Sequence, residues 1–337
     1  MKYTNIAVIY GSDSSEWEVS CRSGEFTASR IDDSKYSIYE IFARFGQWHL
    51  VSFRKKGAMR IKFPEEARPE INKNDFSVNI YGEIIKFDFA FIMQHGTPGE
   101  NGLLQGYLEM LNVPFSSCRS FVAAVTFDKY SCKSYLRDVD FVKLAPDMLV
   151  RKGSDLEAFT EQVNKKIGWP VFVKPTSGGS SFGVTKVHSS AKMLQALNCA
   201  FIEGDAVIAE KAIEGREFTC AAYKDAQGVK PLPVIEIVTK NEYFDYDAKY
   251  NGNSEEICPA QIDEELANHI KDVTCKIYSH MGCSGVVRAD YILGKDGLYF
   301  LEVNTIPGMT NASLVPKMVR AAGLDMTDFL TGIIESA

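Results

Sequence analysis

Short apolar runs alternate with amphipathic stretches along the chain, which is typical of strands that alternate with helices. The apolar run at residues 6–10 predicts a first strand, and the polar loop at 11–15 leads into a helix from about Glu16 that Ser14 or Ser15 could cap. Farther along, the pattern predicts strand-like runs within 36–53, a hairpin at 77–87, a strand at 87–93 and a helix at 103–111. Strand–loop–helix units of this kind indicate an α/β region that ends near residue 117.

Two further regions follow the first. The pattern of the middle region predicts helices at 121–136, 155–167 and 191–201, and strands at 148–150, 171–174, 184–187 and 206–210. The pattern of the last region predicts strands at 218–223 and 232–238, a helix at 264–281, a hairpin at 285–304, and helices at 314–322 and 326–336. A polar loop at 241–258 carries several aromatic residues, which favours a packed lid. We therefore expect three domains, with bounds 1–117, 118–212 and 213–337.

Composition narrows the class of protein. The 337 residues are 45% hydrophobic and carry 37 basic and 44 acidic side chains, for a net charge of −7. This balance is typical of a soluble globular chain, and the absence of a basic block argues against a nucleic-acid partner. No apolar stretch approaches the length of a membrane span. Eight cysteines without a CxxC pair favour reduced thiols in a cytoplasmic protein.

The hairpin at 285–304 carries the strongest chemical signal. Strand residues two apart share a face, so Arg288 and Asp290 lie on one face of the first strand, and Glu302 and Asn304 lie on one face of the second. A turn centred near Asp296 places Asp290 opposite Glu302 and Arg288 opposite Asn304. Oxygen ligands of this kind suit Mg²⁺ that also binds phosphates. The alternative is a solvated face of alternating polar residues.

Four weaker signals surround this hairpin. Lys174 precedes a small-residue loop, TSGGSSFG at 176–183, whose backbone N–H groups could wrap an anion or simply form a turn. His95 follows a strand, at the carboxyl end where open α/β sheets bind ligands, although a single histidine is often structural. The segment 210–218 could bind adenine and ribose or be a solvated strand end. Residues 307–313 open a helix, whose N-terminus could bind a carboxylate or carry an ordinary cap.

In this order, these features resemble the ATP-grasp fold, and specifically the D-alanine–D-alanine ligase family, from residue 6 to about residue 334. The most specific stretches are HGTPGENGLLQG at 95–106, RAD at 288–290 and EVNTIPGMT at 302–310. The resemblance implies an α/β (α+β) fold of three domains with an open parallel sheet in the N-terminal one. It also implies a cytoplasmic homodimer that acts in peptidoglycan synthesis.

The family's reaction joins two D-alanines. ATP phosphorylates the carboxylate of one, and the amine of the second displaces the phosphate. The resemblance implies ATP and two Mg²⁺ ions as cofactors, with Mn²⁺ able to replace Mg²⁺. Alignment and charge neutralisation are what phosphoryl transfer needs, so no nucleophilic serine is required.

The resemblance also carries roles onto this chain, residue by residue. The residues expected to bind metal are Asp290, Glu302 and Asn304. Those expected to bind ATP are Lys129, Lys174, Ser180, Ser181, Glu210, Lys211, Ile213 and Glu217. Those expected to bind the substrates are Glu16, His95, Lys249 and Ser313. Arg288 and the Gly308 backbone stabilise the tetrahedral intermediate, and a hydrogen-bonded triad latches the lid, formed by Glu16, Ser180 and Tyr250. The family's usual double glycine after the first strand is here Gly11-Ser12.

Three alternatives stay open at this point. A ligase for D-lactate or D-serine would share the fold, but Tyr250 favours D-alanine in the second site. A non-catalytic nucleotide sensor would be expected to lose a metal carboxylate or Arg288, and all are present. An NAD-dependent dehydrogenase would need GxGxxG after the first strand, where residues 11–16 read GSDSSE.

Overall fold

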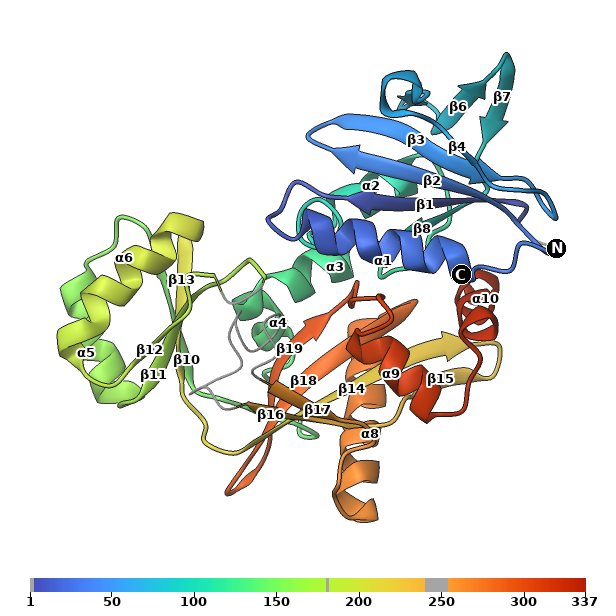
Figure 1. Cartoon of the computed structure of the whole chain (residues 1–337). Helices are drawn as coiled ribbons and strands as arrows, with labels where there is room; N and C mark the ends of the chain where they lie inside the picture. Colours follow the sequence, from blue (N-terminus) through green and yellow to red (C-terminus); the bar gives the residue numbers. More distant parts are fainter. Residues whose placement is uncertain (1–2, 180–181, 240–253) are drawn as a thin grey trace.

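The computed structural model of the chain describes residues 3–179, 182–239 and 254–337. Within these residues the strands form four sheets, and Figure 1 shows the three larger ones around the centre of the molecule. Tyr3, the first described residue, lies beside the C-terminal residue, since its hydroxyl donates a hydrogen bond to the Ala337 carbonyl at 3.2 Å. No helix in the described part of the chain is long and apolar enough to cross a membrane.

The N-terminal sheet has the order β4-β3-β2-β1-β8. Strand β1 pairs in parallel with β2 and β8, whereas β3 and β4 add antiparallel strands, so the expected parallel sheet is mixed at one edge. A small sheet, β5-β6-β7, contains the predicted hairpin. The elements are β1 (Asn5–Gly11), α1 (Trp17–Arg30), β2 (Ser37–Arg44), β3 (Gln47–Arg54), β4 (Ile61–Lys62), η1 (Glu65–Ala67), β5 (Ile71–Asn72), β6 (Ser77–Ile80), β7 (Glu83–Lys86), β8 (Phe89–Ile92) and α2 (Leu103–Met110).

The start of α1 differs from the prediction. The helix begins at Trp17, and its N-cap residue is Glu16, whose side chain makes no capping hydrogen bond. Ser14 instead accepts a hydrogen bond on Oγ from the Glu16 backbone N–H at 3.1 Å. The Glu16 carboxylate therefore does not cap its own helix.

A four-stranded antiparallel sheet, β10-β13-β11-β12, forms a separate unit with two helices packed on it (Figure 1). Its core holds small and branched side chains such as Val163, Val173 and Ala209. The elements are β10 (Asp147–Arg151), α5 (Leu156–Lys166), β11 (Val171–Pro175), β12 (Thr185–Val187), η2 (Ser190–Lys192), α6 (Met193–Glu203) and β13 (Ala206–Lys211).

The largest sheet follows the path β17-β16-β14-β18-β19-β9, with β15 paired to β14. Strands β15 and β17 were not predicted, and β17 occupies residues expected to be loop. The elements are β9 (Lys143–Leu144), β14 (Arg216–Asp225), β15 (Gly228–Pro231), β16 (Ile235–Thr239), β17 (Ser254–Ile257), α8 (Glu264–Met281), β18 (Val286–Gly294), β19 (Gly297–Asn304), α9 (Leu314–Ala321) and α10 (Met326–Ser336).

The predicted helix at 121–136 is two helices, α3 (Ser120–Phe127) and α4 (Lys129–Tyr135). Asp128 separates them in an extended conformation, and its side chain accepts a hydrogen bond from the Ser131 N–H at 2.7 Å. Because Asp128 acts as an N-cap, a new helix begins at Lys129. Cys118, Cys132 and Leu136 then pack in one core with the largest sheet and α8.

Candidate active site

A cleft of about 460 Å³ opens where the N-terminal sheet, the largest sheet and the small-residue loop meet. Its walls include eight residues that the sequence singled out, which are Glu16, His95, Lys129, Arg288, Glu302, Asn304, Gly308 and Ser313. These residues are spread over nearly 300 positions of sequence. The fold therefore brings together groups from α1, from the end of β8, from α4 and from the β18–β19 hairpin.

The hairpin register is confirmed. Arg288 pairs with Asn304, and Asp290 pairs with Glu302. The turn, however, closes between Gly294 and Gly297, half a residue earlier than expected. A β-bulge at Leu301 of β19, opposite the step from Asp290 to Tyr291, absorbs the difference and restores the expected pairing of Asp290 with Glu302.

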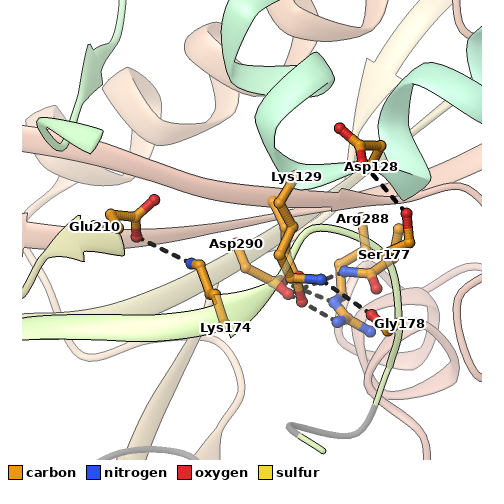
Figure 2. Close-up of polar contacts among 10 residues, drawn as sticks. Asp128, Lys129, Lys174, Ser177, Gly178, Glu210, Arg288 and Asp290 are labelled. Atoms are coloured by element: carbon orange, nitrogen blue, oxygen red, sulfur yellow. Dashed lines mark hydrogen bonds and ion pairs between the residues drawn. The ribbon is translucent and has the colours of Figure 1, made fainter. Parts of the chain in front are cut away.

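Asp290 accepts hydrogen bonds from three neighbouring side chains. Arg288 donates to it twice, from Nε to Oδ1 at 2.9 Å and from Nη2 to Oδ2 at 2.8 Å (Figure 2). Asn304 Nδ2 donates to Oδ2 at 3.0 Å, and Thr219 Oγ1 donates to Oδ1 at 2.6 Å. A cation that binds this carboxylate must therefore compete with existing donors.

Glu302 faces a different cation. Lys129 Nζ lies 3.5 Å from Glu302 Oε2 and also donates a hydrogen bond to the Gly178 carbonyl at 3.0 Å. Asp128, beside it, accepts a hydrogen bond on Oδ2 from Ser177 Oγ at 3.3 Å (Figure 2). The start of α4 thus ties the small-residue loop to the hairpin. The oxygen atoms of Asp290, Glu302 and Asn304 form a donor set of the kind that Mg²⁺ prefers, so these residues fit a divalent ion.

Lys174 and Glu210 are paired with each other. Lys174 Nζ donates to Glu210 Oε1 at 3.0 Å, and the buried Lys133 donates to Glu210 Oε2 at 2.6 Å (Figure 2 shows the Lys174 pair). Burial alone would raise the pKa of Glu210, but the two ammonium groups outweigh it and hold that pKa below its usual value. Lys133 also pairs with Asp147 at 2.6 Å.

The remaining residues predicted to bind adenine and ribose lie at the end of β13, near the start of β14 and in the connection between these two strands. Lys211 ends β13, and its Nζ donates to the Trp169 carbonyl at 2.6 Å. Ile213 packs against Gly294, where an added Cβ would come within 3.0 Å of Ile213 Cγ2. Glu217 pairs with Ile292 in the β14–β18 ladder. The predicted Ser180, Ser181, Lys249 and Tyr250 lie outside the described residues.

Two carboxyl groups approach each other at the start of α1. Glu16 lies so close to the small-residue loop that a Cβ on Gly179 would fall 2.5 Å from Glu16 Oε2. Glu100 accepts a hydrogen bond on Oε2 from the Gly96 N–H at 2.6 Å. Burial, reinforced by the charge of Glu16, raises the pKa of Glu100 to about 8. The protonated form of Glu100 is therefore favoured up to a higher pH than in an ordinary carboxyl group.

His95 is buried, and both of its ring nitrogens are occupied. Nδ1 lies 3.0 Å from the Ile306 carbonyl, which can only accept, so Nδ1 carries the proton. Nε2 lies 2.9 Å from Ser23 Oγ. Burial lowers the pKa of His95 even though Glu16 is near, so the ring is neutral. These contacts hold the ring against the protein rather than leaving a nitrogen turned to the cleft.

Ser313 occupies the N-cap position of α9 without making a capping hydrogen bond. Its Oγ instead accepts a hydrogen bond from the Thr310 N–H at 3.0 Å. A Cβ on Gly308 would come 3.0 Å from the same oxygen. The loop and the start of α9 are therefore packed closely enough that a glycine is favoured at position 308.

Sequence reasoning missed three residues of the site. Glu100 lies in the HGTPGENGLLQG stretch at 95–106, but no function was predicted for it. Ser23 lies seven residues after Glu16, which is two helical turns and so the same face of α1, a signal that was available. Thr219 contacts Asp290 only because β14 pairs with β18, and no local pattern gives that pairing.

Comparison with known proteins identifies the relatives. Residues 5–118 match the family model described as D-ala D-ala ligase N-terminus, and residues 136–335 match D-ala D-ala ligase C-terminus. A protein of Phocaeicola vulgatus named D-alanine--D-alanine ligase is 44% identical over 337 residues, with 100% of this chain and 99% of that protein covered. One of the same name from Parabacteroides distasonis is 45% identical, with 98% and 96% covered.

Solved structures agree with the sequence matches. The VanG D-Ala:D-Ser ligase of Enterococcus faecalis superposes with a TM-score of 0.86 at 30% identity, covering 99% of each chain. The D-alanine--D-alanine ligase of Bacillus anthracis has a TM-score of 0.76 at 31% identity, covering 98% of this chain and 96% of that one. The fold is therefore the expected ATP-grasp fold, and the chain belongs to the D-alanine–D-alanine ligase family.

Proposed function

We propose that this protein is an ATP-dependent D-alanine–D-alanine ligase that forms D-alanyl-D-alanine, by way of D-alanyl phosphate, for peptidoglycan precursors in the cytoplasm. The observation that carries the proposal is the facing set of Arg288, Asp290, Glu302 and Asn304 in one cleft with the Glu16 carboxylate. Relatives that share at least 40% identity over almost the whole chain bear this name.

Members of this family use ATP together with a divalent metal. Here two Mg²⁺ ions, which Mn²⁺ can replace, would be held by Asp290, Glu302 and Asn304. When bound, the ions neutralise phosphate charge. Lys129, which lies beside Glu302, would contact the phosphates together with Ser180 and Ser181. Lys174, whose Nζ donates to Glu210, would do the same with its remaining donors.

The connection between the sheets is the proposed nucleoside site. Glu210, Lys211 and Ile213 would frame the adenine, and Glu217 would accept hydrogen bonds from the ribose hydroxyls. Lys133 donates to Glu210 Oε2, whereas Lys174 donates to Oε1, and the two charges together lower the pKa of Glu210. Lys133 therefore holds one oxygen of Glu210 independently of Lys174.

Glu16 is the proposed acceptor for the ammonium of the first D-alanine, since its carboxylate faces the cleft at the start of α1. Arg288 and the Gly308 N–H would stabilise the oxyanion that forms when the second amine attacks the acyl phosphate. Lys249 and Ser313 would bind the carboxylate of the second D-alanine. The triad of Glu16, Ser180 and Tyr250 would latch the lid.

D-Alanine is the proposed second substrate because Tyr250 is present, and the names of the bacterial relatives support this choice. A D-serine-specific second site is the competing possibility, because the Enterococcus faecalis structure is named a D-Ala:D-Ser ligase.

A homodimer is a further part of the proposal. So is the division into domains 1–117, 118–212 and 213–337, in which residues 118–142 share a core with the third domain.

The proposal is tested by incubating the purified protein with ATP, Mg²⁺ and D-alanine. We expect one phosphate and one D-alanyl-D-alanine for each ATP consumed, and neither product with L-alanine. ATP consumption without dipeptide in the presence of D-alanine would contradict the proposal. Omitting the metal should abolish both products.

A further inference from the structure

Ser23 lies at the meeting point of three separate parts of the chain. It is fully buried on α1, on the face that carries Glu16. Its Oγ lies 2.9 Å from Nε2 of His95, which is in the loop after β8, and accepts a hydrogen bond from the Met309 N–H at 3.2 Å. One hydroxyl thus joins the N-terminal sheet unit to the loop that follows β19.

The direction of each hydrogen bond is fixed by its partners. The Ile306 carbonyl only accepts, so the neutral His95 ring donates from Nδ1 and must accept at Nε2. Ser23 has a single proton, which it donates to Nε2. Its oxygen is then free to accept from the Met309 N–H, and all three groups are satisfied inside the protein.

The two anchors enclose the Gly308 peptide. His95 holds the carbonyl of Ile306, and Ser23 holds the N–H of Met309, with only Pro307 and Gly308 between them. Pro307 and Gly308 both line the cleft. Neither Ser23 nor His95 needs to touch a substrate to influence this segment.

We propose that Ser23 and His95 form a positioning pair that fixes the Gly308 amide relative to α1 during the second step of ligation. This inference rests on the proposed function, in which the Gly308 N–H stabilises the intermediate. It assigns His95 to holding the loop and gives Ser23 a part in catalysis that acts through other residues.

The test compares Ser23→Ala with a matched control, Ser20→Ala. Ser20 is also fully buried on α1 and makes two hydrogen bonds, to the Gly11 N–H at 3.0 Å and the Met93 carbonyl at 2.6 Å, but none to the 306–309 loop. We expect Ser23→Ala to lower kcat for dipeptide formation about tenfold, with KM for ATP within about twofold. Ser20→Ala should keep kcat within about twofold while losing comparable thermal stability.

A second variant tests whether the two residues act together. Because both residues hold the same Gly308 peptide, Ser23→Ala combined with His95→Asn should lose less than the product of the two single losses. Multiplied losses in the double variant, a tenfold loss in Ser20→Ala, or an unchanged kcat in a folded Ser23→Ala protein would each overturn the inference. Wild-type protein that makes no D-alanyl-D-alanine would instead refute the proposed function itself.

A spectroscopic signature is independent of turnover. The chain has five histidines, so ¹⁵N-labelled histidine gives a resolvable spectrum. We expect one neutral ring with its proton on Nδ1, and a shift of its Nε2 signal in Ser23→Ala but not in Ser20→Ala. A wild-type His95 protonated on Nε2 would contradict the pairing.

Discussion

Asp290 and Glu302 face each other across β18 and β19, yet each is neutralised by a different cation. Asp290 receives two hydrogen bonds from Arg288, and Glu302 lies 3.5 Å from Lys129 Nζ. Two carboxylates this close in a partly buried cleft would otherwise repel. The protein thus pairs each carboxylate with a cationic side chain of its own, and bound metal ions would have to compete with these partners.

Glu302→Gln tests the proposed metal site. The amide keeps the shape of the side chain but removes the charge, so we expect kcat for phosphate release to fall on the order of a hundredfold or more. The control is Glu83→Gln, which removes an exposed carboxylate paired with Lys55 outside the cleft and should leave kcat unchanged. Near-normal turnover in a folded Glu302→Gln protein would remove Glu302 from the metal site.

Glu100→Gln tests the buried proton. The pKa of Glu100 is raised to about 8 in the folded chain, above the ordinary 4.5, so the folded state binds the proton more tightly than the unfolded state. Stability from this group is complete below about pH 4.5 and is lost as pH rises towards 8. We expect the ligand-free wild type to lose stability over this window relative to Glu100→Gln, as measured by urea unfolding at several pH values. Parallel pH profiles would show that Glu100 is ionised in the folded protein.

Lys133→Met tests the buried charge network. Lys133 is 1% exposed and sits between Asp147 and Glu210, which are nearly as buried. Arg137 and Lys174 still reach these carboxylates, so we expect a loss of about 3 kcal/mol in the free energy of unfolding. Lys152→Met, which removes an exposed lysine near Asp205, should change it by less than about 1 kcal/mol. Equal effects of the two substitutions would contradict this assignment.

Tyr250→Phe tests the choice of second substrate. The tyrosine lies outside the described residues, and its role follows from the family resemblance. Loss of its hydroxyl should shift the product ratio towards the depsipeptide when D-alanine and D-lactate compete, as quantified by mass spectrometry. An unchanged ratio of dipeptide to depsipeptide, with turnover retained, would show that Tyr250 does not select the second substrate.

The chemistry of the hairpin could be predicted from sequence because it is local. Strand alternation fixes which side chains share a face, and a short turn limits the possible registers. The expected register proved right although the turn did not sit where it was placed, since the bulge after Asp290 compensates. A sequence pattern cannot locate such a bulge.

Features that depend on distant contacts could not be predicted. The ring of His95 is fixed by Ser23 and Ile306, which are 72 and 211 residues away. The pairing of Lys174 with Glu210 likewise depends on the β11–β13 ladder. In contrast, the break at Asp128 had a local signal, since an aspartate before KYS can cap a new helix, and the apolar pattern on both sides hid it.

The most direct test of the proposed function is the identity of the product when second substrates compete. The protein is given ATP, Mg²⁺ and D-alanine, with equimolar D-serine and D-lactate present, and all products are identified by mass. We predict D-alanyl-D-alanine as the dominant product, with phosphate released in equal amount. A predominance of D-alanyl-D-serine or D-alanyl-D-lactate, or no ligation product at all, would contradict the assignment of this protein as a D-alanine–D-alanine ligase.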